Sequence, residues 1–169
     1  PTTLLAMVDA SIGGKTGFDL REGKNLIGAF YPPSFVLADP SVLSTLPERE
    51  LRAGLAEVVK HGVIADKELF DLCAQGWNAV TENLSMLVRR GMAVKIKVIE
   101  EDPYEYGIRA ALNYGHTVGH AVEVVSHFDY LHGEAVAIGM VVEARLAERL
   151  SLADSCVADA IADVLTGLK

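Results

Sequence analysis

Cysteine is scarce in this chain of 169 residues, and neither a long apolar run nor a basic excess is present. The two cysteines, Cys73 and Cys156, provide no disulfide framework, which suits a reducing compartment. The longest apolar stretches, such as residues 135–142, fall well short of the ~20 residues needed to span a bilayer. We therefore expect a soluble, cytoplasmic protein that does not partner a membrane.

The chain is acidic, with a formal net charge of −8 from 15 lysines and arginines and 23 aspartates and glutamates. This charge disfavours nucleic acid as a partner, and it requires that any acidic small molecule be held by cations clustered in a cleft. A hydrophobic content of 50% is enough for the chain to bury a core of its own, at about one domain in length.

A complete phosphate-binding loop is also missing. The run Gly13-Gly14-Lys15-Thr16 superficially resembles the loop of nucleoside triphosphatases, but that loop has a glycine five positions before Gly14, where Asp9 stands. No glycine-rich strand–turn–helix unit for a dinucleotide precedes this segment. We therefore do not expect a nucleoside triphosphatase.

Three histidines and one glutamate are spaced so that they can converge on one divalent metal ion. His116 and His120 lie four residues apart, on one face if this segment is helical. His132 follows, and Glu57 places a carboxylate in an otherwise apolar helical segment, where an unpaired charge is costly. Two or three imidazoles with one carboxylate are the ligand set of a catalytic Zn²⁺-type site that stays open to substrate at one position.

His116 and His120 are open to a second interpretation, as partly buried helix residues with hydrogen-bond partners. Gly115 and Gly119 favour a functional site, because glycine costs roughly 1 kcal/mol inside a helix and suits places where a ligand or another backbone approaches closely. Thr117 stands where the zinc peptidase pattern has its glutamate base, so we do not expect a peptidase.

The pattern changes from strands and turns to helices near residue 46. Strands are expected over residues 4–8, 15–20 and 34–38. Thr45 and Glu48 predict a capping box for a helix with Pro47 in its first turn. Further helices are expected over residues 66–74, 81–101, 110–126, 133–151 and 155–165.

Several ordered blocks of the sequence resemble one enzyme family. They are PTTLLAMVD at 1–9, GGKTG at 13–17, GKNLIGAF at 23–30, LPERE at 46–50, GLAEVVKHG at 54–62, GIRAALNYGHTVGH at 107–120 and HGEAV at 132–136. On these motifs the chain resembles the 3-dehydroquinate synthases, within the wider group of sugar-phosphate cyclases.

The resemblance implies a role for each matching residue. Glu57, His116 and His132 match the family's metal ligands, usually for zinc, with cobalt as the other candidate. His120 matches an active-site histidine beside the substrate phosphate and the proton that is moved. Lys60, one helical turn from Glu57, matches an ammonium that grips substrate hydroxyls.

Other matching residues are expected to contact the substrate or NAD. The substrate side is implied to contain Asp9, Asn25, Lys95, Arg109, Asn113 and Lys15. Among these, the fork of Arg109 with Lys95 suits a substrate carboxylate, whereas the point charge of Lys15 suits a phosphate. The positions implied on the NAD side are Thr2, Thr3, Asp9, Lys15, Lys24, Val42, Leu43, Ser44 and Thr45.

The activity implied is conversion of 3-deoxy-D-arabino-heptulosonate 7-phosphate into 3-dehydroquinate and phosphate in the shikimate pathway of aromatic amino acid biosynthesis, with NAD⁺ used and regenerated. Residues 1–46 are then the end of an NAD-binding α/β domain, and residues 47–169 a helical metal- and substrate-binding domain that is incomplete at its C-terminal end. We expect an α+β portion of a two-domain α/β enzyme, inactive alone. The full-length parent is expected to form a homodimer and to bind a phosphorylated sugar acid.

Three alternatives stay open. Other sugar-phosphate cyclases, of the 2-deoxy-scyllo-inosose or valiolone synthase type, share the metal and NAD chemistry but need no carboxylate clamp, so Arg109 and Lys95 favour the dehydroquinate interpretation. Metal-dependent dehydrogenases of the glycerol dehydrogenase type would not need the cations Lys15, Lys24, Lys60 and Arg109. The third alternative is a non-catalytic metal-binding helical module.

Overall fold

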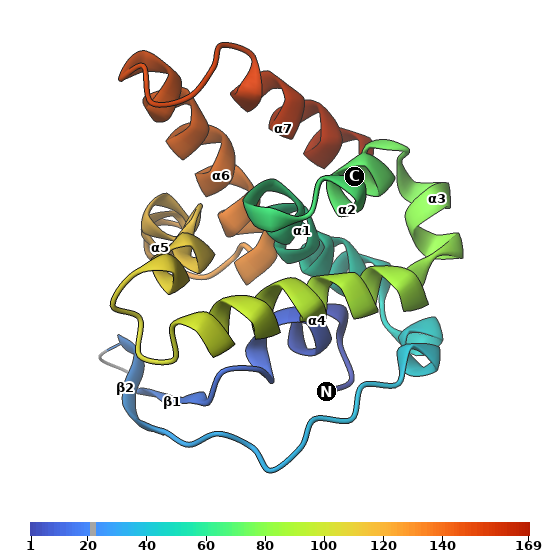
Figure 1. Ribbon diagram of the computed structural model, residues 1–169, viewed down its shortest axis with the longest axis vertical. Coiled ribbons are helices and arrows are strands. Elements are labelled where there is room, and N and C mark those ends of the chain that lie inside the picture. The colour runs from blue at the N-terminus through green and yellow to red at the C-terminus, as the bar shows by residue number, and fades with distance from the viewer. Residues whose placement is uncertain (21–22) are drawn as a thin grey trace.

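The computed structural model describes residues 1–20 and 23–169, without the side chains at positions 19 and 23–25. In chain order the elements are η1 (Ala6–Ala10), β1 (Lys15–Leu20), β2 (Gly23–Phe30), η2 (Pro40–Thr45), α1 (Glu48–Ala65), α2 (Lys67–Ala74), α3 (Trp77–Glu82), α4 (Leu84–Glu101), η3 (Ile108–Asn113), α5 (His116–Val125), α6 (His132–Arg149) and α7 (Val157–Gly167). Here η1 is a π-helical turn, and η2 and η3 are 3₁₀ helices. A two-stranded sheet followed by helices confirms the expected fold class (Figure 1).

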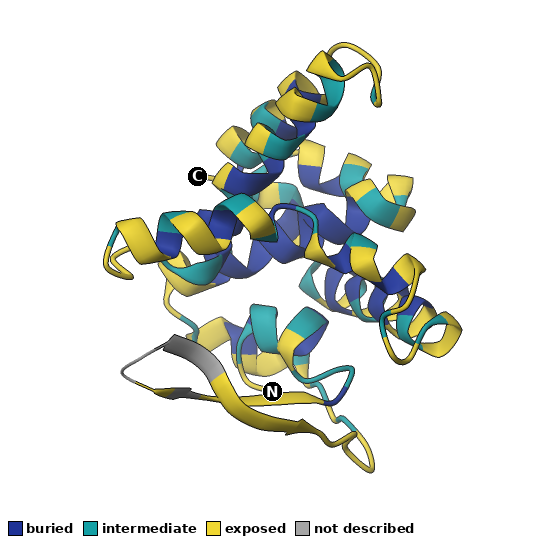
Figure 2. Cartoon of the chain, turned by 90° about the vertical axis from the view of Figure 1, so that its left-hand side faces the viewer, coloured by how far each residue is buried: buried dark blue, intermediate teal, exposed yellow. Residues whose placement is uncertain are grey.

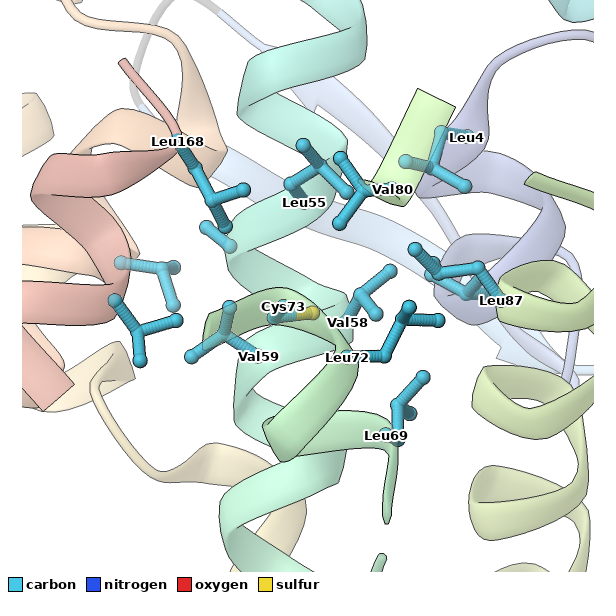
Figure 3. Packing of buried hydrophobic residues seen from close by; sticks show 14 of the residues in the cluster. Leu4, Leu55, Val58, Val59, Leu69, Leu72, Cys73, Val80, Leu87 and Leu168 are labelled. Atoms are coloured by element: carbon cyan, nitrogen blue, oxygen red, sulfur yellow. The ribbon is translucent and has the colours of Figure 1, made fainter. Parts of the chain in front are cut away.

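Helix α1 runs through the middle of the molecule, and α2, α4, α6 and α7 pack around it (Figure 1). Leu55, Val58 and Val59 of α1 lie in one apolar cluster with Leu69 of α2 and Leu87 of α4 (Figure 3). Burying a side chain of this size contributes about 1.5–3 kcal/mol relative to leaving it in water. The packing therefore holds α1 rigidly and fixes where its polar side chains point.

The N-terminal segment is helical, so the strand predicted over residues 4–8 is wrong. Leu4, Met7 and Val8 are fully buried and follow helical spacing, and η1 packs against α1 and α4. A short apolar run does not distinguish a strand from a buried helical segment by its periodicity. Here the apolar face packs against α1 and α4, and Asp9, the residue after Val8, therefore lies next to these helices.

Strands β1 and β2 form an antiparallel hairpin at the edge of the molecule, and their residues are mostly exposed (Figure 2). The predicted strand over residues 15–20 is confirmed, whereas β2 was not predicted. The strands approach so closely that a Cβ on Gly28 would lie 1.9 Å from the backbone oxygen of Thr16. Residues 34–38, predicted as a third strand, form an irregular segment in which Phe35 is 81% exposed, so no partner strand fixes it.

The predicted capping box at the start of α1 is wrong. The hydroxyl of Thr45 donates to the backbone oxygen of Val42 over 3.0 Å, and α1 begins after Pro47 without a side-chain cap. Glu48 instead accepts a 2.9 Å hydrogen bond from Nε of Arg52 one turn later. The hydroxyl of Thr45 therefore bonds to the preceding turn and does not cap α1.

Two predicted helices are interrupted. The helix over 81–101 is divided at Asn83 into α3 and α4, and the helix over 110–126 is divided before Gly115 into η3 and α5. Gly115 has a left-handed φ of +79°, which ends the first segment and begins the second in a new direction. No helix within the described ranges is both long and apolar enough to cross a membrane.

Helices α5 and α6 pack backbone against backbone because glycines line their contact. A Cβ added at Gly139 would lie 1.9 Å from the backbone oxygen of Gly115, and one at Gly119 would lie 3.2 Å from that of Ala135. Of the two causes expected for Gly115 and Gly119, a ligand or another backbone, the structure shows another backbone. The close contact brings the first residues of α5 and α6 next to each other.

Candidate metal centre

Three side chains from three helices converge, namely Glu57 of α1, His116 at the start of α5 and His132 at the start of α6. Oε1 of Glu57 lies 3.6 Å from Nε2 of His116 and 3.4 Å from Nε2 of His132. The candidate ligand atoms of the three residues all lie within 4.8 Å of one another. Ligands of a tetrahedral zinc ion, each about 2.0–2.1 Å from the metal, are about 3.3 Å apart, so this spacing fits one ion.

Glu57 has the properties of a metal ligand. It is fully buried, and its Oε1 lies 3.4 and 3.6 Å from the Nε2 atoms of the two imidazoles. Nζ of Lys60 contacts Oε2 as an ion pair, which leaves Oε1 facing the two imidazoles. Burial raises the pKa of Glu57, but His132 and the charge of Lys60 together bring it below its ordinary value. A buried, ionised oxygen opposite two nitrogens suits a divalent cation.

Each of the two histidine rings is oriented by a hydrogen bond at Nδ1. Nδ1 of His116 lies 3.1 Å from the backbone oxygen of Tyr114, and Nδ1 of His132 lies 3.2 Å from Oε1 of Glu123. Because these oxygens accept, Nδ1 of each ring carries a proton, and in the neutral form of the ring Nε2 then has the lone pair that a metal would need. Burial lowers the pKa of His116, whereas Glu57 raises that of His132.

His120 lies beside this cluster but is exposed. Its ring centre is 5.4 Å from that of His116 and 6.0 Å from that of His132. With Glu123 and His132 it forms a second group whose atoms lie within 4.8 Å of one another. Its exposure makes its ring accessible to a bound substrate, while His116 and His132 face Glu57.

A second set of polar residues surrounds Asp9, next to Glu57. Nζ of Lys95 donates to the backbone oxygen and to Oδ1 of Asp9 over 2.6 and 2.8 Å, and Nζ of Lys60 lies 3.9 Å from the same Oδ1. Nε2 of His61 lies 3.8 Å from it, and burial and the charge of Lys60 lower the pKa of His61 to about 4. Burial also lowers the pKa of Lys95. Two buried ammonium groups and a neutral imidazole therefore share one carboxylate.

Arg109 is buried and connects the loop before η3 to the segment before β1. Nη2 donates to the backbone oxygen of Gly13 over 3.1 Å, and Nη1 donates to that of Pro103. The backbone N–H of Arg109 donates to Oδ2 of Asp102 over 3.1 Å. Part of the guanidinium is thus used within the protein, and its role as a carboxylate clamp stays a prediction.

Lys15 and Asn113 meet at Glu105 near the surface. Nζ of Lys15 forms an ion pair with Oε2 of Glu105, and Nδ2 of Asn113 donates to Oε1 over 2.6 Å. The contact with Lys15 lowers the pKa of Glu105. The two residues assigned to the phosphate side are therefore neighbours, although their contact with phosphate stays a prediction.

Two family models together match the whole chain. The model of the 3-dehydroquinate synthase N-terminal part matches residues 1–53, and the model of the C-terminal part matches residues 54–169. The chain belongs to the 3-dehydroquinate synthase family. The sequence blocks that carry the resemblance are thus those of its own family.

Curated 3-dehydroquinate synthases align with almost the whole chain. The enzyme of Pseudarthrobacter chlorophenolicus is 51% identical over 99% of this chain and 47% of the relative, and that of a Picosynechococcus species is 54% identical over 90% and 44%. The chain spans about half the length of the curated relatives it matches.

Solved structures of related cyclases have the same fold. A 2-epi-5-epi-valiolone synthase from Streptomyces hygroscopicus subsp. jinggangensis with NAD⁺ and Zn²⁺ bound superposes with a TM-score of 0.89 at 35% identity, over 98% of this chain and 48% of that one. A 2-deoxy-scyllo-inosose synthase complexed with carbaglucose-6-phosphate, NAD⁺ and Co²⁺ gives 0.89 at 35%, over 99% and 48%.

The positions that the family resemblance assigns to NAD differ in their surroundings. Thr2 is exposed, while Oγ1 of Thr3 accepts a 3.1 Å hydrogen bond from the backbone N–H of Ala6. In η2, Leu43 is buried in the core, and the hydroxyl of Ser44 donates to the backbone oxygen of Ser41 over 2.8 Å. The side chains of Lys24 and Asn25 lie outside the described part of the structure. These NAD contacts stay predictions.

Sequence reasoning missed four polar residues beside the site: His61, Glu105, Glu123 and Glu143. His61 and Glu123 are buried, and Glu123 lies three residues after His120, at a spacing that places both on one helix face. A carboxylate so close to a histidine motif was a usable signal. Glu105 and Glu143 gave none, because their partners are distant in the sequence or belong to the backbone.

A cleft of about 740 Å³ lies between α1, α6 and α7, and the chain neighbours of two candidate ligands, Ala56 and Gly133, are among its lining residues. Its apolar lining includes Ala53, Ala137, Val141 and Leu165, and its rim includes Arg49. None of the three candidate ligands is among its lining residues. We therefore place the candidate site at the histidines and not in this cleft.

Proposed function

We propose that a protein of its relatives' length containing this chain acts as a 3-dehydroquinate synthase. It converts 3-deoxy-D-arabino-heptulosonate 7-phosphate into 3-dehydroquinate and phosphate, with NAD and a divalent metal, zinc or cobalt. The names of relatives at 51% and 54% identity support this activity, and the ligands of the two related cyclase structures support these cofactors.

One observation supports the proposal most directly: Glu57 meets His116 and His132 directly beside the buried ammonium of Lys60. A structural ion pair between Glu57 and Lys60 alone would not need two imidazoles aimed at the same buried carboxylate. A catalytic metal with one position left for substrate does need them. The adjacent ammonium then provides a donor for a substrate hydroxyl.

The residues divide the chemical work. When bound, the metal acts as a Lewis acid on a substrate hydroxyl, and NAD accepts and returns a hydride. Glu57, His116 and His132 hold the ion, while Lys60 orients a substrate hydroxyl within reach of it. His120, accessible beside His116, takes and returns a proton at a ring nitrogen near the phosphate-bearing end of the substrate.

The anionic ends of the substrate are assigned to two groups of cations. Lys95 and Arg109 hold the carboxylate, and Lys15 and Asn113 hold the phosphate. Further polar and NAD-side contacts are assigned to Asp9, Asn25, Lys24, Thr2, Thr3, Val42, Leu43, Ser44 and Thr45. The local clustering of lysines and arginine at the site supports binding of an acidic substrate despite the net charge of −8.

We assign residues 1–46 to the NAD-binding part and residues 47–169 to the metal- and substrate-binding part. The change from hairpin to helices supports this boundary, whereas the two family models meet after residue 53, inside α1. We further propose a cytoplasmic homodimer. The two free cysteines suit a reducing compartment, and sedimentation velocity of the complete protein tests the dimer.

The deciding experiment measures phosphate release from the heptulosonate phosphate by the complete protein, with and without NAD and a metal chelator. We expect release that needs both NAD and the metal. Glu57→Gln removes the ligand charge and should abolish release, whereas Glu50→Gln on the exposed first turn of α1 should not. Release that persists in chelator, or in Glu57→Gln, would contradict the proposal.

The same assay separates this activity from that of the other cyclases. A phosphorylated sugar without a carboxylate should release no phosphate, because Lys95 and Arg109 then lack their partner. Faster release from such a sugar would favour an inosose or valiolone type of cyclase, to which the chain is similar in fold at 35% identity.

A further inference from the structure

Two carboxylates connect α5 and α6 in opposite directions next to the candidate metal centre. Glu123 of α5 is 2% exposed, and its Oε1 lies 3.2 Å from Nδ1 of His132, the first residue of α6. A carboxylate at Nδ1 fixes the rotation of an imidazole and its tautomer and makes Nε2 a better donor to a metal. Glu123 therefore acts on the ligand that α6 provides.

The second carboxylate acts on the ligand that α5 provides. Oε2 of Glu143, on α6, accepts a 2.7 Å hydrogen bond from the backbone N–H of Gly115, and Oε1 accepts a 3.2 Å bond from that of Val118. Gly115 has no side chain to cap α5, so a residue of the neighbouring helix satisfies its first N–H groups. His116 lies between the two bonded N–H groups.

The two contacts are reciprocal: α5 holds the histidine of α6, and α6 holds the helix start that bears the histidine of α5. Glycines keep the two backbones in contact, which leaves little freedom for one helix to slide on the other. We propose that Glu123 and Glu143 form a carboxylate clasp that sets the separation of the two imidazole ligands. Both are positioning residues, and neither needs to touch substrate.

This inference rests on the proposed metal centre, and its test uses metal binding by the chain itself. Zn²⁺ affinity is measured by competition with a chromophoric chelator, and ligand geometry by the visible absorption of bound Co²⁺. We expect Glu123→Ala to weaken Zn²⁺ binding about 10- to 100-fold and Glu143→Ala about tenfold, the range known for residues that support metal ligands. Both should change the Co²⁺ bands. Glu123→Gln should recover part of the loss, since its amide oxygen still accepts from Nδ1.

Glu148 provides a matched control. It also lies on α6 and also caps a neighbouring helix, because its Oε1 accepts a 2.9 Å hydrogen bond from the backbone N–H of Ala158 in α7. Glu148→Ala should lower stability as Glu143→Ala does, yet leave Zn²⁺ affinity within twofold and the Co²⁺ bands unchanged.

The outcomes separate two failures. If the unsubstituted chain binds no Zn²⁺, the proposed metal centre is wrong. If it binds Zn²⁺ and Glu123→Ala and Glu143→Ala bind it equally well, or Glu148→Ala weakens binding as much as they do, the clasp alone is wrong. Should an alanine variant fail to fold, Glu123→Gln and Glu143→Gln decide by their Co²⁺ bands, and unchanged bands in both reject the clasp.

Discussion

The inner cluster of charged residues, around Glu57 and Asp9, and the outer cluster, around Glu105, differ chiefly in burial. Lys60 and Glu57 of the inner cluster have side chains 1% and 0% exposed, whereas Lys15 and Glu105 of the outer cluster are 50% and 23% exposed. Removing one partner of a buried pair leaves an uncompensated charge, but an exposed pair contributes about 0–1 kcal/mol. The inner charges are therefore costly, which favours a functional reason for them.

The largest effect is expected from removing the inner ammonium. Lys60→Met retains most of the side-chain volume but leaves Glu57 without its cation, so the free energy of unfolding should fall by about 3–5 kcal/mol. Urea unfolding with chelator present measures it, because a bound metal would mask the loss. Lys67→Met is the control, since Lys67 pairs with Asp71 at an exposed position. If Lys60→Met lowers the free energy of unfolding no more than Lys67→Met does, the inner pair is no more important for stability than an exposed pair, and the prediction is wrong.

A bound metal should stabilise the folded protein through the inner cluster and not through the outer one. Zn²⁺ at one hundred times its Kd should raise the free energy of unfolding by about 2.7 kcal/mol, through preferential binding to the folded state. Glu57→Gln should lose this gain, and Glu105→Gln should keep it. The comparison is of thermal midpoints with Zn²⁺ and with chelator. Equal gains in both variants would mean that zinc binds elsewhere.

A smaller effect is expected at Arg109, which belongs to neither cluster and is assigned to the substrate carboxylate. Arg109→Lys keeps the charge but loses the planar fork, so binding of the acidic substrate by the complete enzyme should weaken by roughly 1.5 to 3 kcal/mol. Zinc content should not change. Measurement of KM, kcat/KM and zinc stoichiometry checks both statements. Intact kcat/KM, or loss of zinc, would assign Arg109 to bracing the loop through Gly13 and Pro103.

The smallest effect belongs to the outer pair. Lys15→Met should change the free energy of unfolding by at most about 1 kcal/mol, and added salt should shrink the difference. The pKa of Glu105 is lowered by Lys15. The contribution of the Lys15–Glu105 pair to stability is therefore fully present above the unfolded pKa of Glu105, about 4.3, and is lost as pH falls through its lower folded pKa. Denaturant midpoints of both proteins at pH 7 and pH 3 test this, and a gap that widens at pH 3 contradicts it.

Local spacing predicted the helical part well and the N-terminal part poorly. The bounds expected for α2, α6 and α7 agree with the structure to within two residues, because apolar spacing over several turns identifies a helix. Residues 4–8 were assigned to a strand since five apolar residues fit either element. Only their burial against α1 and α4 determines that they are helical.

Some residues of the candidate site could likewise be predicted from local sequence, and others could not. Glu57 and the three histidines could be nominated from the sequence, because a carboxylate in an apolar helix and two histidines at helical spacing are unusual locally. The family resemblance then selected Glu57, His116 and His132 as the ligands. Glu143 could not be nominated, since it holds two backbone N–H groups of a helix that begins 27 residues earlier and leaves no pattern in side-chain types. A sequence motif cannot predict a contact with a backbone N–H group, because every residue other than proline has one.

By itself, the sequence determined the kinds of groups available: the acidic net charge, the shortage of cysteine, the spacing of the histidines and the helical identity of most of the chain. Tertiary structure alone decided which of these groups meet. Asp9 reaches Lys60 and Lys95 because η1 packs on α1 and α4, and His132 faces Glu57 with Nε2 because Glu123 holds Nδ1. Such contacts join residues far apart in the chain, and only the packing of apolar faces, which is not directional by itself, brings them together.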